Sequence, residues 1–270
     1  MNDQNPTGNW PEFASSTPGS GAPPPPVIPP AGPTLGADEG ERRPISGLVE
    51  AVEAILRQPR RVMFQLMQPS PGRLIAALLA IAAISSLIYG LVVGTFSGAE
   101  QLWAAPVKIF AGLFISALIC LPSLYIFSCL GGSQARLVEV FGLVAGLLAL
   151  MTVLLIGFAP VAWVFSQSTQ SVAGMGALHL VFWSVAAIFG LRFLGSGFSH
   201  FSTRSYAGLR VWILVFLLVA LQMTTALRPI VGRAKTLLPS ANEKKFFIGH
   251  WMDCVNAETD KPQQASTEAH

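Results

Sequence analysis

Few residues in this sequence could do chemistry, and they stand in unusual surroundings. The segment SALICLPSLYIFSCLGG, residues 116–132, puts Cys120, Pro122 and Cys129 inside one long apolar run. The two cysteines differ by about 900° around a helix, so they lie on opposite faces. They cannot share a metal ion or form a disulfide within that helix. Pro122 lacks a backbone N–H, and we expect it to mark a structural bend and no functional site. The two glycines that end the segment should stop the helix.

A second candidate for chemistry is the segment LGSGFSH, which holds Ser196, Ser199 and His200. A serine nucleophile needs a base and an oxyanion hole that the fold puts in place. This segment is instead typical of a polar loop, and its likeness to an intramembrane serine protease is superficial. The four histidines of the chain lack the i, i+4 spacing of a helical zinc motif. We therefore expect a protein that is not an enzyme, with no catalytic residue, metal or cofactor.

The elements that position these residues must be long apolar helices. Of the 270 residues, 52% are hydrophobic and 11% are charged, whereas a soluble domain carries about 25% charged residues. Apolar runs of about 20 residues are long enough to cross a hydrocarbon core of ~30 Å. The sequence therefore predicts an all-α polytopic membrane protein, a bundle of about five transmembrane helices. The five spans are predicted at residues 74–96, 103–130, 138–158 (closed by Pro160), 177–194 and 211–227.

The same pattern divides the chain into four regions. We predict a disordered arm at residues 1–44, because its Pro/Gly-rich sequence cannot bury enough apolar surface to become ordered. Residues 45–68 have the periodicity of an amphipathic helix, which Pro59 should end or kink. That helix lies at the membrane surface or packs on the spans, and both alternatives stay open. The membrane domain covers residues 69–230 and a tail covers residues 231–270.

The tail contains the segment SANEKKFFIGHWMDCV, which predicts a second amphipathic helix at residues 240–255. Ser240 and Glu243 form a capping box, in which each side chain satisfies a backbone donor of the other. Aromatic residues in such a helix favour the membrane interface. We expect Phe247 and Trp251 to anchor the helix there.

The positions of the basic residues indicate how the chain is oriented across the membrane. They precede the first span and lie between the second and third and between the fourth and fifth, while the other two connections are nearly bare. This asymmetry predicts a cell-membrane protein with a cytoplasmic N-terminus. With five spans, the basic tail then lies on the non-cytoplasmic side of the membrane, which conflicts with the preference of basic residues for the cytoplasmic side. Some basic residues could also bind anionic lipid headgroups, and the candidates are Arg60, Arg61, Arg192, Arg204, Arg210, Lys244 and Lys245.

Glycines recur at intervals of four along two of the predicted spans. Gly90, Gly94 and Gly98 lie along the first span, and Gly142 and Gly146 along the third. Small residues at this spacing let helix backbones approach closely. The pattern favours packing within the chain and dimerisation equally.

Ionisable residues are sparse inside the spans. Lys108, Glu139, His179 and Arg192 all lie near predicted span ends, and no span has a charge at its centre. Ion-coupled carriers usually place ionisable residues within the membrane, where such residues are costly. The pattern therefore counts against such a carrier, but not against a pore for neutral solutes.

The organisation of residues 45–227 resembles the Yip family of five-span membrane proteins, and especially its bacterial relatives. The shared pattern is the lead-in RQPRRVMFQLMQPSPG followed by five closely packed spans with short loops. The resemblance implies a cytoplasmic N-terminus, a non-enzymatic membrane-organising or adaptor role, and association with other membrane proteins. The chain has no counterpart of the DLYGP and GTPIP-like motifs of eukaryotic members, so no functional residue is carried over.

These observations predict a non-catalytic scaffold, adaptor or assembly factor. Its expected partners are the lipid bilayer and other membrane proteins or a second copy of itself. The alternative is a permease or channel subunit for a neutral or small solute. We expect no nucleic-acid partner, because the basic residues behind the net charge of +3 lie beside apolar runs, where they report topology.

Overall fold

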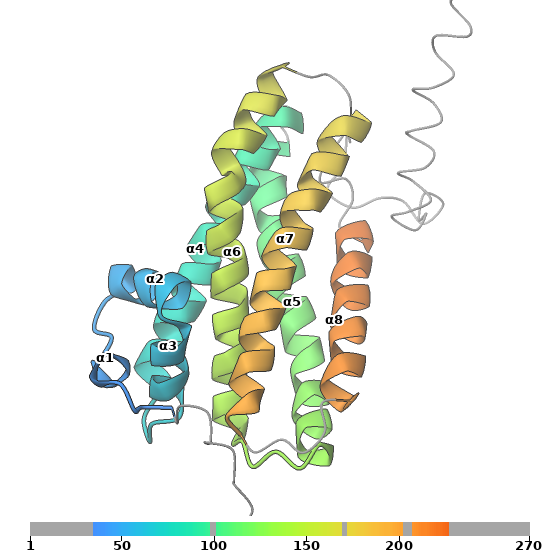
Figure 1. Ribbon diagram of the computed structural model, residues 1–270. Helices are drawn as coiled ribbons and strands as arrows, with labels where there is room; N and C mark the ends of the chain where they lie inside the picture. Colours follow the sequence, from blue (N-terminus) through green and yellow to red (C-terminus); the bar gives the residue numbers. More distant parts are fainter. Residues whose placement is uncertain (1–34, 98–100, 169–171, 202–206, 227–270) are drawn as a thin grey trace, which may run out of the picture. The chain divides into compact units, whose positions relative to one another are not determined.

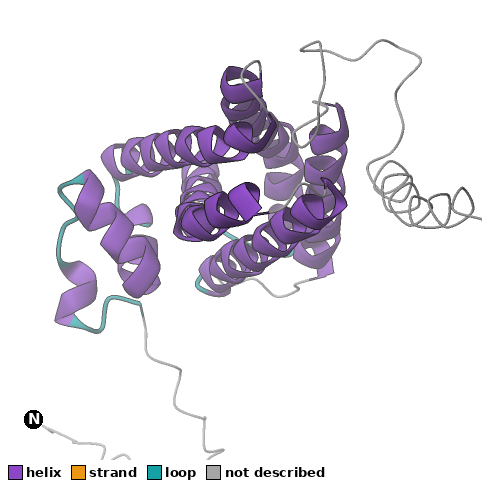
Figure 2. Cartoon of the chain, turned by 90° about the horizontal axis from the view of Figure 1, so that it is seen from above, coloured by secondary structure: helices purple, strands orange, loops and turns teal. Residues whose placement is uncertain are grey.

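The computed structural model describes residues 35–97, 101–168, 172–201 and 207–226. Helices are the regular elements of this part of the chain (Figures 1 and 2). They are α1 (Glu39–Arg42), α2 (Leu48–Arg57), α3 (Pro59–Leu66), α4 (Gly72–Ser97), α5 (Gln101–Leu130), α6 (Leu137–Ser168), α7 (Val172–Ser199) and α8 (Ala207–Ala226).

Four of these helices, α4 to α7, are long and apolar enough to cross a membrane, and α8 is a shorter fifth apolar helix. Its 20 residues extend about 30 Å at 1.5 Å per residue, close to the thickness of the hydrocarbon core. The prediction of an all-α, polytopic helical membrane protein is confirmed. The predicted tail helix at residues 240–255 lies outside the described residues.

Helix α6 is the most enclosed of the long helices. It packs against α4 and α7, and α2 and α3 add further contacts (Figure 1). As a result, 72% of its most apolar window is buried, against 39–44% for α4, α5 and α7. Helix α5 packs against α4, and α8 packs mainly against α5. The principal contacts therefore connect the helices in the order α7, α6, α4, α5, α8.

Two predicted helix ends are wrong, both because the helices continue further. Pro160 does not close the third span, since α6 runs through it to Ser168. Pro160 is exposed on the helix surface, so it removes one backbone hydrogen bond without displacing a packed neighbour. Similarly, α7 continues past residue 194 to Ser199. The segment 195–199, predicted as a polar loop, is helical.

The end of α5 follows its local sequence. Gly132 has φ 79°, the left-handed conformation that glycine adopts without strain. The Ser133 N–H donates to the Ser128 carbonyl at 3.0 Å and the Gly132 N–H to the Cys129 carbonyl at 2.9 Å. This is the Schellman arrangement that satisfies the last carbonyls of a helix. The predicted stop at the two glycines after Leu130 is confirmed.

The structure also places the two cysteines of the segment 116–132. Helix α5 is one continuous element through both of its prolines, Pro106 and Pro122. Cys120 is buried, Cys129 is exposed, and both are free thiols. The prediction that the two cysteines lie on opposite faces of one helix is confirmed.

Candidate functional site

The chain before the first long helix folds into a distinct substructure, residues 35–68, which we call the platform. Helix α2 ends at Arg57, Gln58 leaves the helical conformation with φ −133° and ψ 58°, and α3 starts with Pro59 as its first residue. Proline suits that position because its missing N–H would have no helical partner. The single helix predicted at residues 45–68 is therefore two helices, divided at the expected proline. The arm predicted to continue to residue 44 instead contains α1, which packs on α3.

The platform packs against the membrane domain through small residues on α6. Leu66 of α3 approaches Gly142, and Ile55 of α2 approaches Gly146. A Cβ at Gly142 would lie 2.7 Å from the Leu66 side chain, which is closer than atoms can pack. Of the two alternatives left open by the sequence, packing on the chain's own helices is therefore present. The buried platform residues are Ala51, Ala54, Ile55, Val62, Met63 and Leu66.

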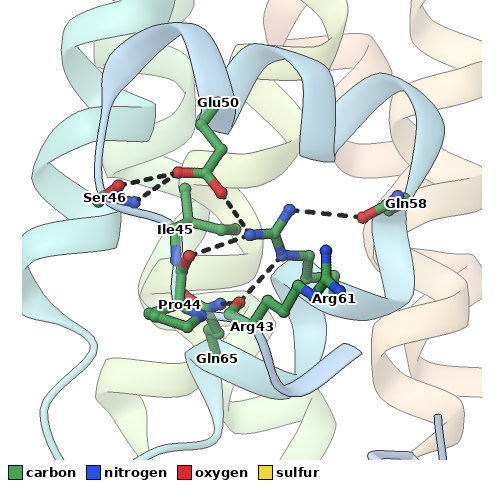
Figure 3. A network of polar contacts seen from close by, with 8 residues as sticks. All are labelled: Arg43, Pro44, Ile45, Ser46, Glu50, Gln58, Arg61 and Gln65. Carbon is green, nitrogen blue, oxygen red and sulfur yellow. Dashed lines mark hydrogen bonds and ion pairs between the residues drawn. The ribbon is translucent and has the colours of Figure 1, made fainter. Parts of the chain in front are cut away.

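Arg61 holds the connection between α1 and α2 in place (Figure 3). Its Nε donates to the Arg43 carbonyl and its Nη2 to the Pro44 carbonyl, each at 3.0 Å. Nη2 also pairs with the Glu50 carboxylate. The Arg61 side chain is only 11% exposed. Its planar, multiply donating guanidinium suits this role, which a lysine could not fill.

The Glu50 carboxylate completes this network by accepting hydrogen bonds from residue 46. It accepts from the Ser46 N–H at 2.9 Å and from the Ser46 hydroxyl at 3.0 Å. The Ser46 N–H and the Arg61 guanidinium lower the pKa of Glu50 from its ordinary 4.5 to about 2. Because the folded-state pKa is the lower one, this contact stabilises the platform fully above about pH 4.5. The contribution is lost as the pH falls toward 2.

A second polar cluster joins α1 to α3 within the platform. Glu41, a largely buried residue, accepts hydrogen bonds from Arg60 Nε and from the Gly36 N–H, both at 2.5 Å. The Arg60 hydrogen bond is the main cause of a lowered pKa for Glu41, and burial opposes it. Burial and the Arg60 charge in turn lower the pKa of His200, just beyond α7. The Glu41 carboxylate and the Arg60 guanidinium therefore hold α1 on α3, and their charges act on the imidazole of His200.

The predicted headgroup residues that the structure describes lie in two places, in the platform and near the ends of α7 and α8. Arg60 and Arg61 take part in the two platform clusters, while Arg192 and Arg210 are exposed near the ends of α7 and α8. For all four, headgroup binding stays a prediction. The remaining predicted contacts and anchors lie outside the described residues, and they are Arg204, Lys244, Lys245, Phe247 and Trp251.

The arrangement around Arg61 makes a specific prediction. In Arg61→Ala, the carbonyls of Arg43 and Pro44 lose their donors, so the connection should open locally. Amide hydrogen exchange at Ile45 and Ser46 should speed up about five- to tenfold, because one hydrogen bond contributes about 1–1.5 kcal/mol.

The matched control is Arg57→Ala, which removes an exposed arginine whose ion pair, among the described residues, is with Glu53 on the helix surface. Exchange at residues 45 and 46 should stay unchanged in that variant. Equal exchange rates in both variants would show that Arg61 does not hold the connection.

The predicted glycine faces serve packing within the chain wherever the structure describes their surroundings. Gly90 meets the backbone of Pro106 on α5, and Gly146 meets the Phe193 ring on α7 as well as Ile55. Gly94 is buried within α4, and Gly98 lies outside the described residues. Close backbone approach, which the glycine spacing predicted, therefore joins α4 to α5, whereas the α6 glycines make room for side chains of neighbouring helices.

A buried polar pair, which sequence reasoning missed, joins α4 to α7. The Tyr89 hydroxyl and His179 Nδ1 are 2.7 Å apart. Tyr89 is fully buried and His179 is 7% exposed. Among the described residues, the His179 Nε2 atom has no hydrogen-bond partner. Sequence reasoning noted His179 only as a residue near a span end, because 90 positions separate it from Tyr89.

Two of the serine candidates are joined by a hydrogen bond near the end of α7. The Ser199 hydroxyl donates to the Ser196 carbonyl within α7, at 2.6 Å. His200 lies in the electrostatic environment of Arg60 and Glu41. No group of three metal-ligating side chains occurs within the described ranges.

Comparison of the chain with protein-family models, with curated proteins and with solved structures finds no match. The resemblance to the Yip family consequently stays a prediction.

Proposed function

We propose that this chain is a non-catalytic membrane scaffold or adaptor that binds other membrane proteins beside its platform. The observation that carries the proposal is the platform itself. Two networks of buried and half-buried charged groups fix α1, α2 and α3 to one another. Helices α2 and α3 in turn pack against α4 and α6. Such a fixed surface next to the spans suits recognition of another protein, because little order has to be gained on binding.

The proposal includes the orientation of the chain in the cell membrane. Among the described residues, Arg73, Arg136 and Arg210 lie at helix ends that antiparallel packing brings to the same side, where the platform also lies. The preference of arginine for the cytoplasmic side favours a cytoplasmic platform and N-terminus.

The test is site-specific photo-crosslinking in native membranes. A photoreactive residue replaces Gln68, the exposed last residue of the platform, and in a matched variant it replaces Trp163, which is 52% exposed toward the other end of α6. A scaffold should give reproducible protein adducts of defined mass from position 68 and far fewer from position 163. Equal patterns at the two positions would contradict a platform-specific partner.

The second candidate is a permease or channel subunit for a small neutral solute. The observation that favours it is the Tyr89–His179 pair, since polar side chains within membrane helices often mark a solute path. Purified protein alone in liposomes distinguishes the two candidates. Solute flux that disappears in His179→Phe would support the permease and refute the scaffold as the primary role.

A further inference from the structure

Helix α2 lies deeper along the membrane domain than α3 does. Helix α6 begins at Leu137; α3 meets it at Gly142, and α2 meets it at Gly146. At 1.5 Å per residue, the α2 contact is about 6 Å further along α6 than the α3 contact. Ile75, three residues into α4, also approaches Gly142. Helix α3 is therefore level with the first turn of the α4 span, and α2 is beyond it.

The outer surface of α2 is divided into an apolar side and a charged side. At 100° per residue, Leu48, Val52 and Leu56 fall within about 80° of one another. Glu50 and Arg57 lie on the opposite side of that outer surface. The Glu50 carboxylate pairs with Arg61 of α3, so the charged side faces α3. Because α3 is nearer the start of α6, the apolar side of α2 faces toward the middle of the membrane domain.

This apolar side is uncovered by the described part of the chain. Leu48, Val49 and Leu56 are 47%, 84% and 44% exposed. A surface that is level with the spans and turned toward the middle of the bilayer meets acyl chains. The nearby charges fit the same placement, because Arg57 pairs with Glu53 at 3.3 Å and its long side chain can extend to the headgroups.

We propose that α2 and α3 form a wedge in one leaflet, and that the protein therefore concentrates where that leaflet is convex. The occupant of the apolar α2 surface is the lipid of that leaflet. Helices of 10 and 8 residues are about 15 and 12 Å long and about 10 Å wide. Together they add about 250–300 Å² to one leaflet, with no described counterpart in the other. Amphipathic helices inserted in this way respond to curvature.

This inference does not depend on the proposed protein partner, and its test uses lipids alone. The full-length protein is reconstituted into giant vesicles from which thin tubes are pulled outward. A cysteine replaces Gln68, and Cys129 and Cys254 are replaced with serine, while Cys120 is buried. A membrane-impermeant dye then labels only molecules whose platform faces outward.

Platform-outward molecules should be enriched about twofold or more on the tubes relative to the parent vesicle. Dye sealed inside the vesicles labels the opposite orientation, which should be depleted on the same tubes. The reversal of sign with orientation is a readout that general misfolding cannot produce. Equal distribution of both orientations, or enrichment of both, would overturn the wedge.

Substitutions test which side of α2 is responsible. The triple variant Leu48→Gln, Val49→Gln, Leu56→Gln should lose at least half of the enrichment, because glutamine draws water and headgroups toward α2. The matched control, Glu53→Gln with Arg57→Gln, alters the charged side of the same helix. This variant should keep the enrichment on the tubes. Unchanged enrichment in the triple variant would contradict the proposal. A dimer in detergent that the triple variant abolishes would also contradict it, by assigning this surface to a second copy.

Discussion

Gly90→Ala should destabilise the membrane domain, although it adds a single methyl group. A Cβ at this position would overlap the Cα and nitrogen of Pro106 on α5. These are backbone atoms, so no side-chain rotation can relieve the overlap, and α4 and α5 must separate. Overpacking of this kind costs about 1–3 kcal/mol. We expect the midpoint of thermal unfolding in mild detergent, followed by tryptophan fluorescence, to fall by about 5 °C or more.

Gly157→Ala is the matched control for this substitution. It adds the same methyl group to α6, at an exposed position where a Cβ would meet nothing within 4 Å. Replacing a helical glycine with alanine there should be neutral or stabilise the helix by up to about 1 kcal/mol. If both variants unfold at the same temperature, the Gly90–Pro106 approach does not limit stability.

Trp212→Ala should have the largest effect on α8. Trp212 is fully buried and stacks on Phe216 at a centroid distance of 5.1 Å. Its indole N–H donates to the Cys120 carbonyl of α5 at 2.8 Å. Removing a buried tryptophan costs about 3–5 kcal/mol. Because α8 packs mainly against α5, the loss should release α8 before the rest of the domain unfolds, as an early step in the unfolding curve.

Trp212→Phe distinguishes the contribution of the aromatic ring to stability from that of the hydrogen bond. It keeps an aromatic ring but removes the donor to Cys120, which should cost about 1 kcal/mol or less, as for other hydrogen bonds between membrane helices. Limited proteolysis of the segment between α7 and α8 reports α8 release directly. Wild-type protection of that segment in Trp212→Ala would show that this side chain does not hold α8 in place.

Local signals in the sequence predicted the local features of the fold. Apolar length predicted the long helices, Pro59 predicted the division of the platform helix, and the glycines after Leu130 predicted the end of α5. Pro160 was misleading because a proline removes only one hydrogen bond from a long helix. In an apolar environment, ending the helix would have left several backbone groups unpaired.

Features that depend on distant residues were beyond sequence reasoning. Arg61 binds carbonyls 17 and 18 positions earlier, and nothing local distinguishes it from an arginine at the lipid surface. The periodicity of α2 shows that it has apolar residues on one face. It does not show that Ile55 packs on Gly146 of α6 while Leu48 and Leu56 stay exposed. Tyr89 and His179 are 90 positions apart in the sequence, and only the tertiary arrangement of α4 and α7 brings them together.

The dependence of α8 on α5 has a consequence for how the chain is made. About 75 residues separate the end of α5 at Leu130 from the start of α8 at Ala207. At about 5–20 residues per second, the ribosome needs roughly 4–15 s to synthesise that stretch. During this interval the Cys120 carbonyl and the surrounding surface of α5 have no Trp212 to bind. Until α8 leaves the insertion machinery, lipid or the machinery itself must cover that surface of α5. Helix α8, the last of the described helices, covers it only at the end of this interval.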